Sequence, residues 1–411
     1  MTEKLSCRFC GSALTETFVD LGKTPLANSY IKAEADIAKE KSYPLHARVC
    51  AECFLVQVED AVPAEDIFSD YAYFSSFSPS WVEHARRYSD ALTARLGLNE
   101  TSMVMEVASN DGYLLRHFVE KKIPVLGIEP AANVAVAAEK VGVTTEVAFF
   151  GKETAERLVE GGKKADLIAA NNVMAHVPDI NDFISGFPIL LADEGVLTVE
   201  FPHLLNLIEK IQFDTIYHEH YSYLSLLTVE KMLARHGMRV FDVEELPTHG
   251  GSLRVFACKE GARHAEGSGL QDIRRKEQAA KLGSLDAYHG FTPFVEKARA
   301  QLLEFLKEAK EQGKTVAAYG AAAKGNTLLN YSSVGLDLIS FVADKNPEKQ
   351  DTFLPGSHIP VFAPEKITEE KPDYVLILPW NIAEEISREM AHIRSWGGQF
   401  AIAIPEFRLL A

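Results

Sequence analysis

Two Cys-x-x-Cys pairs constrain the folding of this chain more than any other feature. They are Cys7–Cys10 in CRFCG and Cys50–Cys53 in CAECF, and they use four of the five cysteines in 411 residues. Each such turn presents two sulfurs to one ion, and two turns complete the tetrahedral thiolate shell that zinc prefers. Because four protein ligands leave no coordination position open, the predicted zinc is structural and contributes folding energy to the first ~60 residues.

Two disulfides or a redox pair are the alternatives for the same cysteines. The chain begins MTEKLSC, with no apolar stretch like that of a secretory signal before the first pair, which favours the cytoplasm and therefore a metal. A hairpin or loop must fill the long interval from Gly11 to Val49. Cys258 lies in the apolar run LRVFAC and is expected to be an inert core residue.

Charge and hydropathy argue against two classes of partner. The net charge of −16 argues against a nucleic-acid surface, and no apolar stretch approaches the length of a membrane span. A hydrophobic content of 47% and a charged content of 24% are those of an ordinary soluble protein. The length predicts two or three domains, and three packed domains can work as a monomer.

Strand and helix patterns divide the chain into three parts of an α/β protein. A zinc-binding domain is expected over residues 1–65, a central domain over 66–260 with an aromatic and helical lead-in at 66–100, and a helical connector with a Rossmann-like domain over 261–411. Apolar runs such as MVMEVA, PVLGIE, DLIAANN and GVLTVEF alternate with helical stretches, GYLLRHFVEKK among them. This alternation predicts a mostly parallel, doubly wound sheet.

The turn after the first central strand is the expected cofactor site. It reads EVASNDG, and the second strand ends GIEPAAN, where a carboxylate can accept both hydroxyls of a ribose. The missing G-x-G-x-x-G and the acid inside the first strand argue against NAD, and the turn resembles that of class I S-adenosylmethionine-dependent methyltransferases. An ordinary βα turn remains the alternative. The expected cofactor residues are Glu106, Ala108, Ser109, Asn110, Asp111, Gly112, Glu129, Pro130, Asn171 and Asn172.

The densest polar and aromatic segment is IYHEHYSYL, residues 216–224. Its histidines titrate near neutral pH and suit proton transfer, while tyrosine hydroxyls can hydrogen-bond a developing oxyanion. His176, in NNVMAHVPD, is expected near the cofactor. A second metal at His-Glu-His and simple packing of a domain seam are the alternatives.

Two further turns are candidates for binding an anion. The first is THGGSLR, with His249, Gly250, Ser252 and Arg254, for which a hairpin with a surface arginine is the alternative. The second is the strand–loop–helix YGAAAKGNT, with Lys324, Asn326 and Thr327, where small residues, a lysine and a helix N-terminus suit a pyrophosphate. Asp344 and Lys345 follow the next strand and are candidates for holding the nucleotide. A turn without a ligand is the alternative for this domain.

Taken together, these segments resemble the sugar C-methyltransferases that act on nucleotide-linked deoxy-4-ketohexoses, best known from the dTDP-sugar C-3-methyltransferases. The resemblance rests on the cysteine pairs, DYAYFSSFSPSW, EVASNDG, NNVMAHVPD, VEFPH, YHEHYSYLS, THGGSLRVF and YGAAAKGNTLLNY. It implies an enzyme of three domains that uses S-adenosylmethionine and a structural zinc. It implies His220 as the catalytic base, with Tyr217, Glu219, His176 and either Tyr71 or Tyr73 lining the sugar site.

The function expected from this resemblance is C-methylation next to a ketone, at C3 of a nucleotide-linked 4-keto sugar, through an enolate. The nucleotide is expected to be dTDP. The alternatives are an NAD(P)-dependent nucleotide-sugar oxidoreductase, disfavoured by the missing glycine motif, and a non-catalytic zinc-ribbon interaction protein, disfavoured by the acidic charge and the YHEHYSY cluster.

Overall fold

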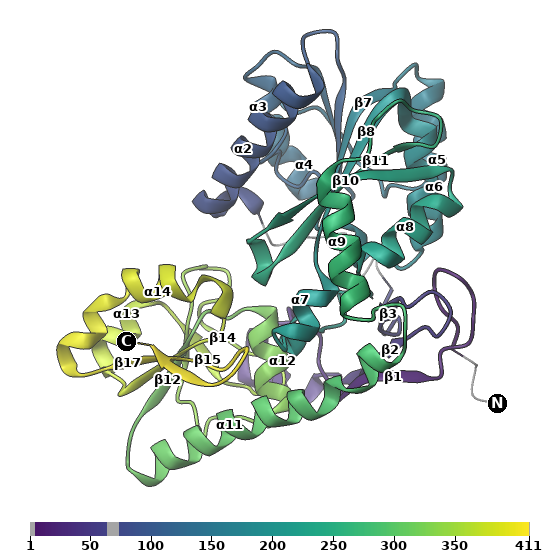
Figure 1. Ribbon diagram of the computed structural model, residues 1–411. Coiled ribbons are helices and arrows are strands. Elements are labelled where there is room, and N and C mark those ends of the chain that lie inside the picture. Colours follow the sequence, from purple (N-terminus) through teal and green to yellow (C-terminus); the bar gives the residue numbers. More distant parts are fainter. Residues whose placement is uncertain (1–4, 64–73, 411) are drawn as a thin grey trace.

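The computed structural model describes residues 5–63 and 74–410, which form a small antiparallel β unit and two α/β units (Figure 1). The expected fold of a small N-terminal zinc-binding domain, a central doubly wound sheet and a C-terminal α/β domain is confirmed. Tyr71 and Tyr73 lie outside the described residues. Within the described ranges, none of the helices has the length and apolarity needed to cross a membrane.

The N-terminal unit is an antiparallel sheet of four strands in the order β1-β2-β3-β9. The strands are β1 (Glu16–Thr24), β2 (Tyr43–Val49), β3 (Val56–Gln57) and β9 (Ser222–Tyr223). The last of them does not come from the N-terminal part of the chain. It belongs to the YHEHYSYL segment, where Tyr223 pairs with Val56 and Ser222 with Gln57. The zinc-binding unit is therefore completed by residues of the expected catalytic stretch.

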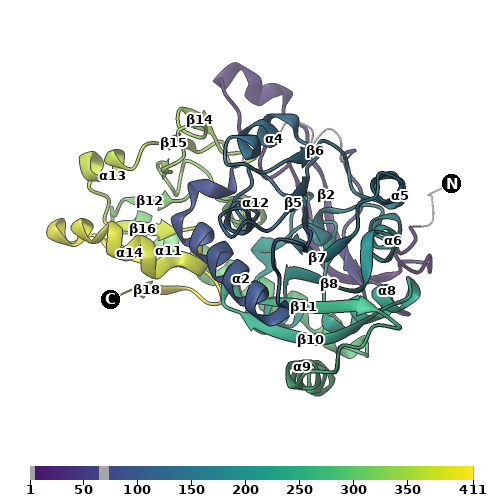
Figure 2. The same cartoon turned by 90° about the horizontal axis from the view of Figure 1, so that it is seen from above.

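The central sheet has seven strands in the order β10-β11-β8-β7-β4-β5-β6, of which β11 is antiparallel to its neighbours. The strands are β4 (Val104–Val107), β5 (Val125–Ile128), β6 (Thr145–Glu146), β7 (Ala165–Asn171), β8 (Leu191–Pro202), β10 (Met238–Leu246) and β11 (Ser252–Lys259). The helices are α2 (Pro79–Leu96), α3 (Arg116–Val119), α4 (Ala132–Glu139), α5 (Lys152–Glu160), α6 (Ile180–Leu190), α7 (Leu204–Glu209), α8 (Leu226–Arg235) and α9 (Ser268–Ala279). In Figure 2, α2 lies between these strands and the C-terminal domain.

Local sequence explains where two of these helices begin and end. Ser78 caps α2 by accepting a hydrogen bond from the backbone N–H of Trp81, and Gly97 ends the helix in the left-handed conformation, as its sequence predicts. The helix expected over residues 112–122 is much shorter, because α3 begins only at Arg116. The preceding turn has positive φ at Ala108, Asn110 and Gly112, and a helix cannot continue through such a backbone.

The C-terminal sheet has the order β14-β15-β13-β12-β16-β17-β18, with a parallel centre and an antiparallel strand at each edge. The strands are β12 (Val316–Tyr319), β13 (Val342–Ala343), β14 (Thr352–Phe353), β15 (Pro360–Phe362), β16 (Tyr374–Ile377), β17 (Gln399–Ile402) and β18 (Arg408–Leu410). The helices from residue 286 onward are α10 (Asp286–His289), α11 (Phe291–Glu311), α12 (Ala323–Tyr331), α13 (Glu365–Glu370) and α14 (Ala383–Glu389).

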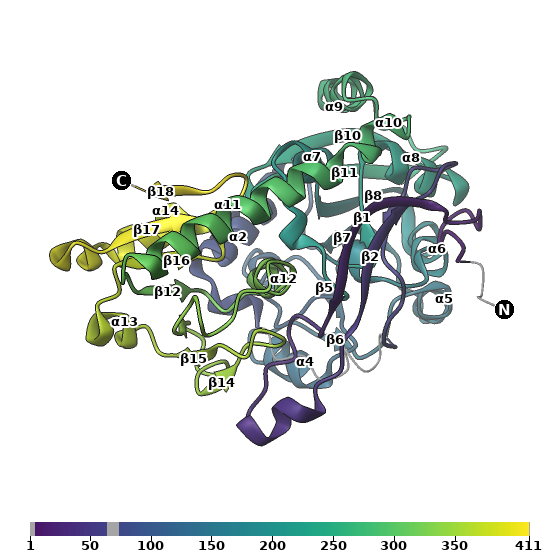
Figure 3. The same ribbon diagram turned by 90° about the horizontal axis from the view of Figure 1, so that it is seen from below.

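Helix α11 joins the C-terminal domain to the N-terminal sheet (Figure 3). Phe291, at its start, stacks on Phe18 of β1 with ring centroids 4.6 Å apart. One hydrophobic core runs from the N-terminal sheet through α11 into the C-terminal sheet. Helix α12 contacts both β1 and the 3-10 helix η4 (Phe213–Thr215), which directly precedes the YHEHYSYL segment. That segment therefore lies where all three units meet.

Candidate active site and zinc centre

The four paired cysteines come together as a metal site. Their sulfur atoms all lie within 4.8 Å of one another, with Cys7–Cys53 at 3.5 Å and Cys10–Cys50 at 3.4 Å. A disulfide has an S–S bond of ~2.05 Å, so the two disulfides considered from the sequence are not formed. Around a tetrahedral zinc with Zn–S bonds of ~2.3 Å, the distances between sulfur atoms are close to those found here, so the site fits zinc. The Gln57 amide donates to the Cys7 sulfur at 3.2 Å, which orients a ligand from outside the shell.

The expected cofactor residues gather at one edge of the central sheet. Glu106 lies in β4, Glu129 directly follows β5, and Asn171 ends β7. Because β5, β4 and β7 are adjacent and parallel, their carboxyl ends meet at the same edge, where ligands of such sheets bind. All three side chains are buried, and burial raises the pKa of Glu106 well above its usual range, an effect that the carboxylates of Glu129 and Asp111 reinforce.

Glu129 bridges the turns that follow the first two strands of the central domain. Its carboxylate accepts a hydrogen bond from the backbone N–H of Asn110 at 2.9 Å and another from that of Ala131 at 3.0 Å. Each carboxylate oxygen can accept a second bond, so the group keeps acceptors for the two hydroxyls of a ribose. Burial raises its pKa.

Several buried polar atoms at this edge have no hydrogen-bond partner in the described part of the chain. They are Ser109 Oγ, Asp111 Oδ1, Asn171 Oδ1 and Asn172 Oδ1. Buried polar groups are almost always paired, so a cluster of unpaired ones at the carboxyl ends of two adjacent strands, β4 and β7, indicates a polar ligand. The residues present therefore fit the polar groups of S-adenosylmethionine.

A contact that the sequence does not reveal supports this turn from the far side. The backbone N–H of Ser75 donates to Asn110 Oδ1 at 2.9 Å, and that of Ser76 donates to Asp111 Oδ2 at 3.1 Å. These serines belong to the 3-10 helix η2 (Ser75–Phe77), so the aromatic lead-in holds the cofactor turn.

His220 is fixed from both sides. Its Nε2 lies 2.8 Å from the hydroxyl of Tyr217, and its Nδ1 lies 2.9 Å from the carbonyl oxygen of Thr215. A carbonyl only accepts, so Nδ1 carries the proton and Nε2 presents its lone pair. His176 lies beside it, with ring centroids 4.7 Å apart, and its Nδ1 is 2.8 Å from the Glu219 carbonyl oxygen.

Electrostatics keeps these two imidazoles neutral. Burial lowers the pKa of His220 well below its usual value, and the neighbouring His176 lowers it further. Burial lowers the pKa of His176 to about 4. A neutral imidazole with one unprotonated nitrogen is the form that removes a proton, so this arrangement can act as a general base near neutral pH.

The two histidines of His-Glu-His face different surroundings. His218 lies 3.1 Å from the carbonyl oxygen of Pro44 and packs against Tyr43, so it fastens the segment to the N-terminal domain. Among the described residues, the four cysteines are the only group of three or more such side chains placed to hold one metal, and His-Glu-His forms no such group. Glu219 is buried and accepts a 3.3 Å bond from Asn28, while its Oε2 has no hydrogen-bond partner among residues 5–63 and 74–410.

The first turn of α12 contributes to the same region. Thr327 donates to the carbonyl oxygen of Ile216 at 3.0 Å, next to Tyr217. Asn326 donates to Ala27 at 2.7 Å, and its Oδ1 is unpaired within the described ranges. Lys324 lies over the Trp380 ring, 4.8 Å from its centroid. Thr327 thus supports the YHEHYSYL segment, whereas Lys324 and Asn326 keep atoms for a ligand.

The other two C-terminal candidates are placed differently. Asp344 accepts a 2.6 Å bond from the backbone N–H of Ala321, in the loop that leads into α12. Lys345 is exposed and forms an ion pair with Glu389 on the surface of the domain. Lys345 is therefore not brought to the reaction centre with Lys324.

The THGG turn joins β10 to β11 beside Trp81. His249 has a φ of 53°, and its ring centroid is 5.3 Å from that of Trp81. Part of the His249 side chain is exposed to solvent, but many protein atoms surround its ring. This burial of the ring, together with the charge of Lys324, lowers the pKa of His249 to about 4. Gly250 lies against Trp380, where an added Cβ would be 2.5 Å from the indole, so only glycine fits.

The arginine that follows this turn is an interior residue. Arg254 is only 5% exposed and donates to Glu200 at 2.7 Å and to Glu244 at 2.9 Å. The surface arginine considered from the sequence is therefore wrong. Ser252 donates to the carbonyl oxygen of Thr248 at 3.0 Å and stabilises the turn itself.

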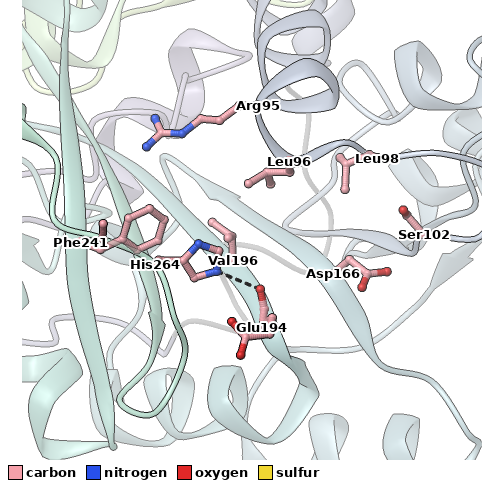
Figure 4. A pocket seen from close by; sticks show the side chains of 10 residues that line it. Arg95, Leu96, Leu98, Ser102, Asp166, Glu194, Val196, Phe241 and His264 are labelled. Carbon is pink, nitrogen blue, oxygen red and sulfur yellow. Dashed lines mark hydrogen bonds between the residues drawn. The ribbon is translucent and has the colours of Figure 1, made fainter.

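Figure 4 shows a pocket at the opposite edge of the central sheet. Ser102 precedes β4 and Asp166 lies at the start of β7, so this pocket faces the amino ends of the strands. His264 stacks on Phe241 there and lies 2.9 Å from the carbonyl oxygen of Glu194. The pocket is thus separate from the cofactor edge.

Comparison with known proteins covers the same three parts. A model for the C-methyltransferase C-terminal domain matches residues 247–405, one for a zinc binding domain matches 7–68, and one for a methyltransferase domain matches 81–243. The C-methyltransferase NovU of Streptomyces niveus is 36% identical over 405 residues, which are 98% of this chain and 96% of that protein.

Two solved structures resemble the chain more distantly. Magnesium protoporphyrin IX methyltransferase (ChlM) from Synechocystis PCC 6803, with bound SAM, is 14% identical at a TM-score of 0.36 and covers 49% of this chain and 100% of that one. The 1,6-didemethyltoxoflavin-N1-methyltransferase of Burkholderia thailandensis is 17% identical at a TM-score of 0.36 and covers 51% of this chain and 97% of that one.

The full-length match decides between the classes that the sequence leaves open. It disfavours an NAD(P)-dependent oxidoreductase and a non-catalytic zinc-ribbon protein, since the relative named above is a C-methyltransferase and the match spans nearly the whole of both chains. The chain belongs to the S-adenosylmethionine-dependent C-methyltransferases that carry an N-terminal zinc-binding domain.

Proposed function

We propose that this enzyme methylates the carbon next to the ketone, C3, of a nucleotide-linked 4-keto-deoxyhexose, with dTDP as the favoured nucleotide. The observation that carries the proposal is the neutral His220, whose Nε2 lone pair is shared with the Tyr217 hydroxyl at 2.8 Å. A base beside a hydroxyl donor suits removal of a proton next to a carbonyl. The name of the relative NovU agrees with methyl transfer to carbon.

In the proposed reaction His220 Nε2 takes the C3 proton, which the adjacent ketone acidifies. The negative charge of the resulting enolate collects on the C4 oxygen, where the Tyr217 hydroxyl donates a hydrogen bond. Neutral His176 does not suit this role, because its one N–H is directed to the carbonyl oxygen of Glu219. A positioned base contributes ~10²–10⁴-fold, and a lost oxyanion donor costs about 3 kcal/mol. S-adenosylmethionine, when bound, supplies an electrophilic methyl group for the C3 carbanion.

Side chains from all three domains are proposed to hold the ligands. Glu129 and the turn from Glu106 to Gly112 bind the cofactor, with Pro130, Asn171 and Asn172 beside it. Glu219, with its unpaired Oε2, binds a sugar hydroxyl. The nucleotide portion is assigned to the first turn of α12, the THGG hairpin and Asp344, while Tyr71, Tyr73 and Lys345 stay predictions from the sequence. The active form is proposed to be a cytoplasmic monomer, which size-exclusion chromatography tests for the oligomeric state.

The test is mass spectrometry of the enzyme with S-adenosylmethionine and a panel of nucleotide-linked 4-keto-6-deoxyhexoses in deuterated water. We expect a gain of one methyl group on carbon, with deuterium washed into unreacted substrate at the acidic position. His220→Asn should bind both ligands and lose most turnover and exchange, because the amide is not a base. His392→Asn is the matched control, since His392 is exposed and contacts Thr368. Wild-type rates in His220→Asn would refute the base assignment.

A further inference from the structure

Two consecutive residues of the 3-10 helix η4, Asp214 and Thr215, contact different parts of the molecule. The carbonyl oxygen of Thr215 holds His220 Nδ1 at 2.9 Å, and Asp214 Oδ2 accepts the indole N–H of Trp380 at 2.7 Å. Trp380 belongs to the 3-10 helix η6 (Trp380–Ile382) of the C-terminal domain. The same short helix therefore orients His220 and hydrogen-bonds the C-terminal domain.

Asp214 is fully buried although it is a carboxylate. Its exposed fraction is 0%, and its Oδ1 has no hydrogen-bond partner among the described residues. A buried carboxylate with an unpaired oxygen is costly unless a positive charge compensates it. Burial raises the pKa of Asp214 to about 6, which the charge of Lys324 and the Trp380 hydrogen bond oppose.

Lys324 is the cation that faces this carboxylate. Its ammonium donates to Asn381 Oδ1 at 2.6 Å and lies over the Trp380 ring, and both of these partners are neutral. Enclosure by protein lowers the pKa of Lys324, and Asp214 opposes this shift. An ammonium has three donors, so the group keeps donors for anionic oxygens of a ligand. The indole of Trp380 links the pair, since it bonds Asp214 and packs under Lys324.

We propose that Asp214 is a positioning residue of the methyl transfer, which holds the cation Lys324 and, through Trp380, sets the C-terminal domain against the turn that orients His220. The inference rests on the proposed function. Lys324 then presents a positive charge to the anionic oxygens of the substrate, and Asp214 is the counter-charge that makes a cation tolerable there. The other titratable groups facing this cation are His220 and His249. Burial lowers the pKa of both, and the charge of Lys324 adds to this shift.

Two substitutions separate the two parts of this role. Asp214→Asn keeps an oxygen acceptor for the indole N–H and removes the negative charge. Trp380→Phe keeps a ring under Lys324 and the charge of Asp214, and removes the indole donor. We expect kcat to fall at least about tenfold in both, because small displacements of a base are costly. Only Asp214→Asn should move the alkaline limb of the kcat profile to lower pH, since Lys324 then loses its proton more easily.

A measurement that needs no turnover tests the charge coupling itself. Amine acetylation of Lys324, followed by peptide mass spectrometry across pH, gives the pH at which the ammonium loses its proton. We expect this midpoint to be about one pH unit lower in Asp214→Asn than in the wild type, and unchanged in Trp380→Phe. The control is Asp373→Asn. It removes a carboxylate that pairs with Lys314 at 2.7 Å, at the amino ends of the strands of the C-terminal sheet.

The two readouts distinguish failure of this inference from failure of the proposed function. If no panel sugar is methylated, the acetylation midpoints still test whether Asp214 holds Lys324 charged. Equal midpoints in wild type and Asp214→Asn overturn the inference whatever the substrate is. Should Asp214→Asn fail to fold, Trp380→Phe decides, because unchanged kcat in that variant removes the positioning role.

Discussion

The ring of His220 lies between the hydroxyl of Tyr217, 2.8 Å from Nε2, and the carbonyl oxygen of Thr215, 2.9 Å from Nδ1. The second contact fixes the tautomer, so the first places a phenol at the lone pair that acts as base. When a substrate carbon takes the position at Nε2, the phenol is released and lies beside the reacting atoms. In the proposed reaction the imidazole removes the proton and the Tyr217 phenol hydrogen-bonds the enolate oxygen.

Replacing Tyr217 by Phe should lower kcat about 10²-fold, because a lost donor to a developing oxyanion costs about 3 kcal/mol. Steady-state kinetics measures this effect, and Tm should stay within a few degrees because the ring is retained. Tyr374→Phe serves as control, since Tyr374 packs on Phe305 in the C-terminal domain. A kcat within twofold of wild type in Tyr217→Phe would remove Tyr217 from the donor role.

The acid limb of kcat/KM should lie below pH 6.5. A base works when neutral, and burial lowers the pKa of His220, so the group stays unprotonated until the pH falls through that lower value. Because the neighbouring His176 lowers this pKa further, His176→Asn should move the limb upward, toward the ordinary histidine value. The profile is measured with both substrates varied separately. A limb at or above pH 6.5 in the wild type contradicts the assignment.

Glu129→Gln should weaken S-adenosylmethionine binding by at least about tenfold. The amide keeps one acceptor but turns a donor toward a backbone N–H that Glu129 now satisfies, which costs about 1–3 kcal/mol. Isothermal titration calorimetry gives the affinity. Glu139→Gln, at the exposed end of α4, is the matched control. Equal affinities in the two variants would remove Glu129 from the cofactor site.

Loss of zinc should reduce activity as well as stability. Cys50→Ser removes a ligand of the shell next to β3, whose partner β9 contains Tyr223 from the catalytic stretch. We expect the bound zinc to fall, Tm to drop by at least about 5 °C, and kcat to fall with it. Cys258→Ala, outside the metal site, should keep its zinc. Full activity in a zinc-free Cys50→Ser protein would show that the two regions are independent.

Much of the site could be predicted because its parts are close in sequence. The cysteine pairs, the turn from Glu106 to Gly112 and the stretch from Tyr217 to His220 each carry their chemistry within a few residues. The contacts that assemble them join distant segments, as in Asn28 with Glu219 or Asp214 with Trp380, and a single sequence holds no signal for such pairs. Local spacing also failed to separate His218, which binds the N-terminal domain, from His220.

The stretch from Phe213 to Ser225, which contains η4 and β9, also bears on how domains can be exchanged between such enzymes. This short stretch supplies an edge strand to the N-terminal sheet, and α12 donates to Ile216 within it through Thr327. A chimera that exchanges only the C-terminal domain between relatives would join a foreign α12 and a foreign indole to a native stretch. We therefore expect a chimera in this family to be active only when the stretch from Phe213 to Ser225 comes from the same relative as the N-terminal sheet and α12, which it contacts.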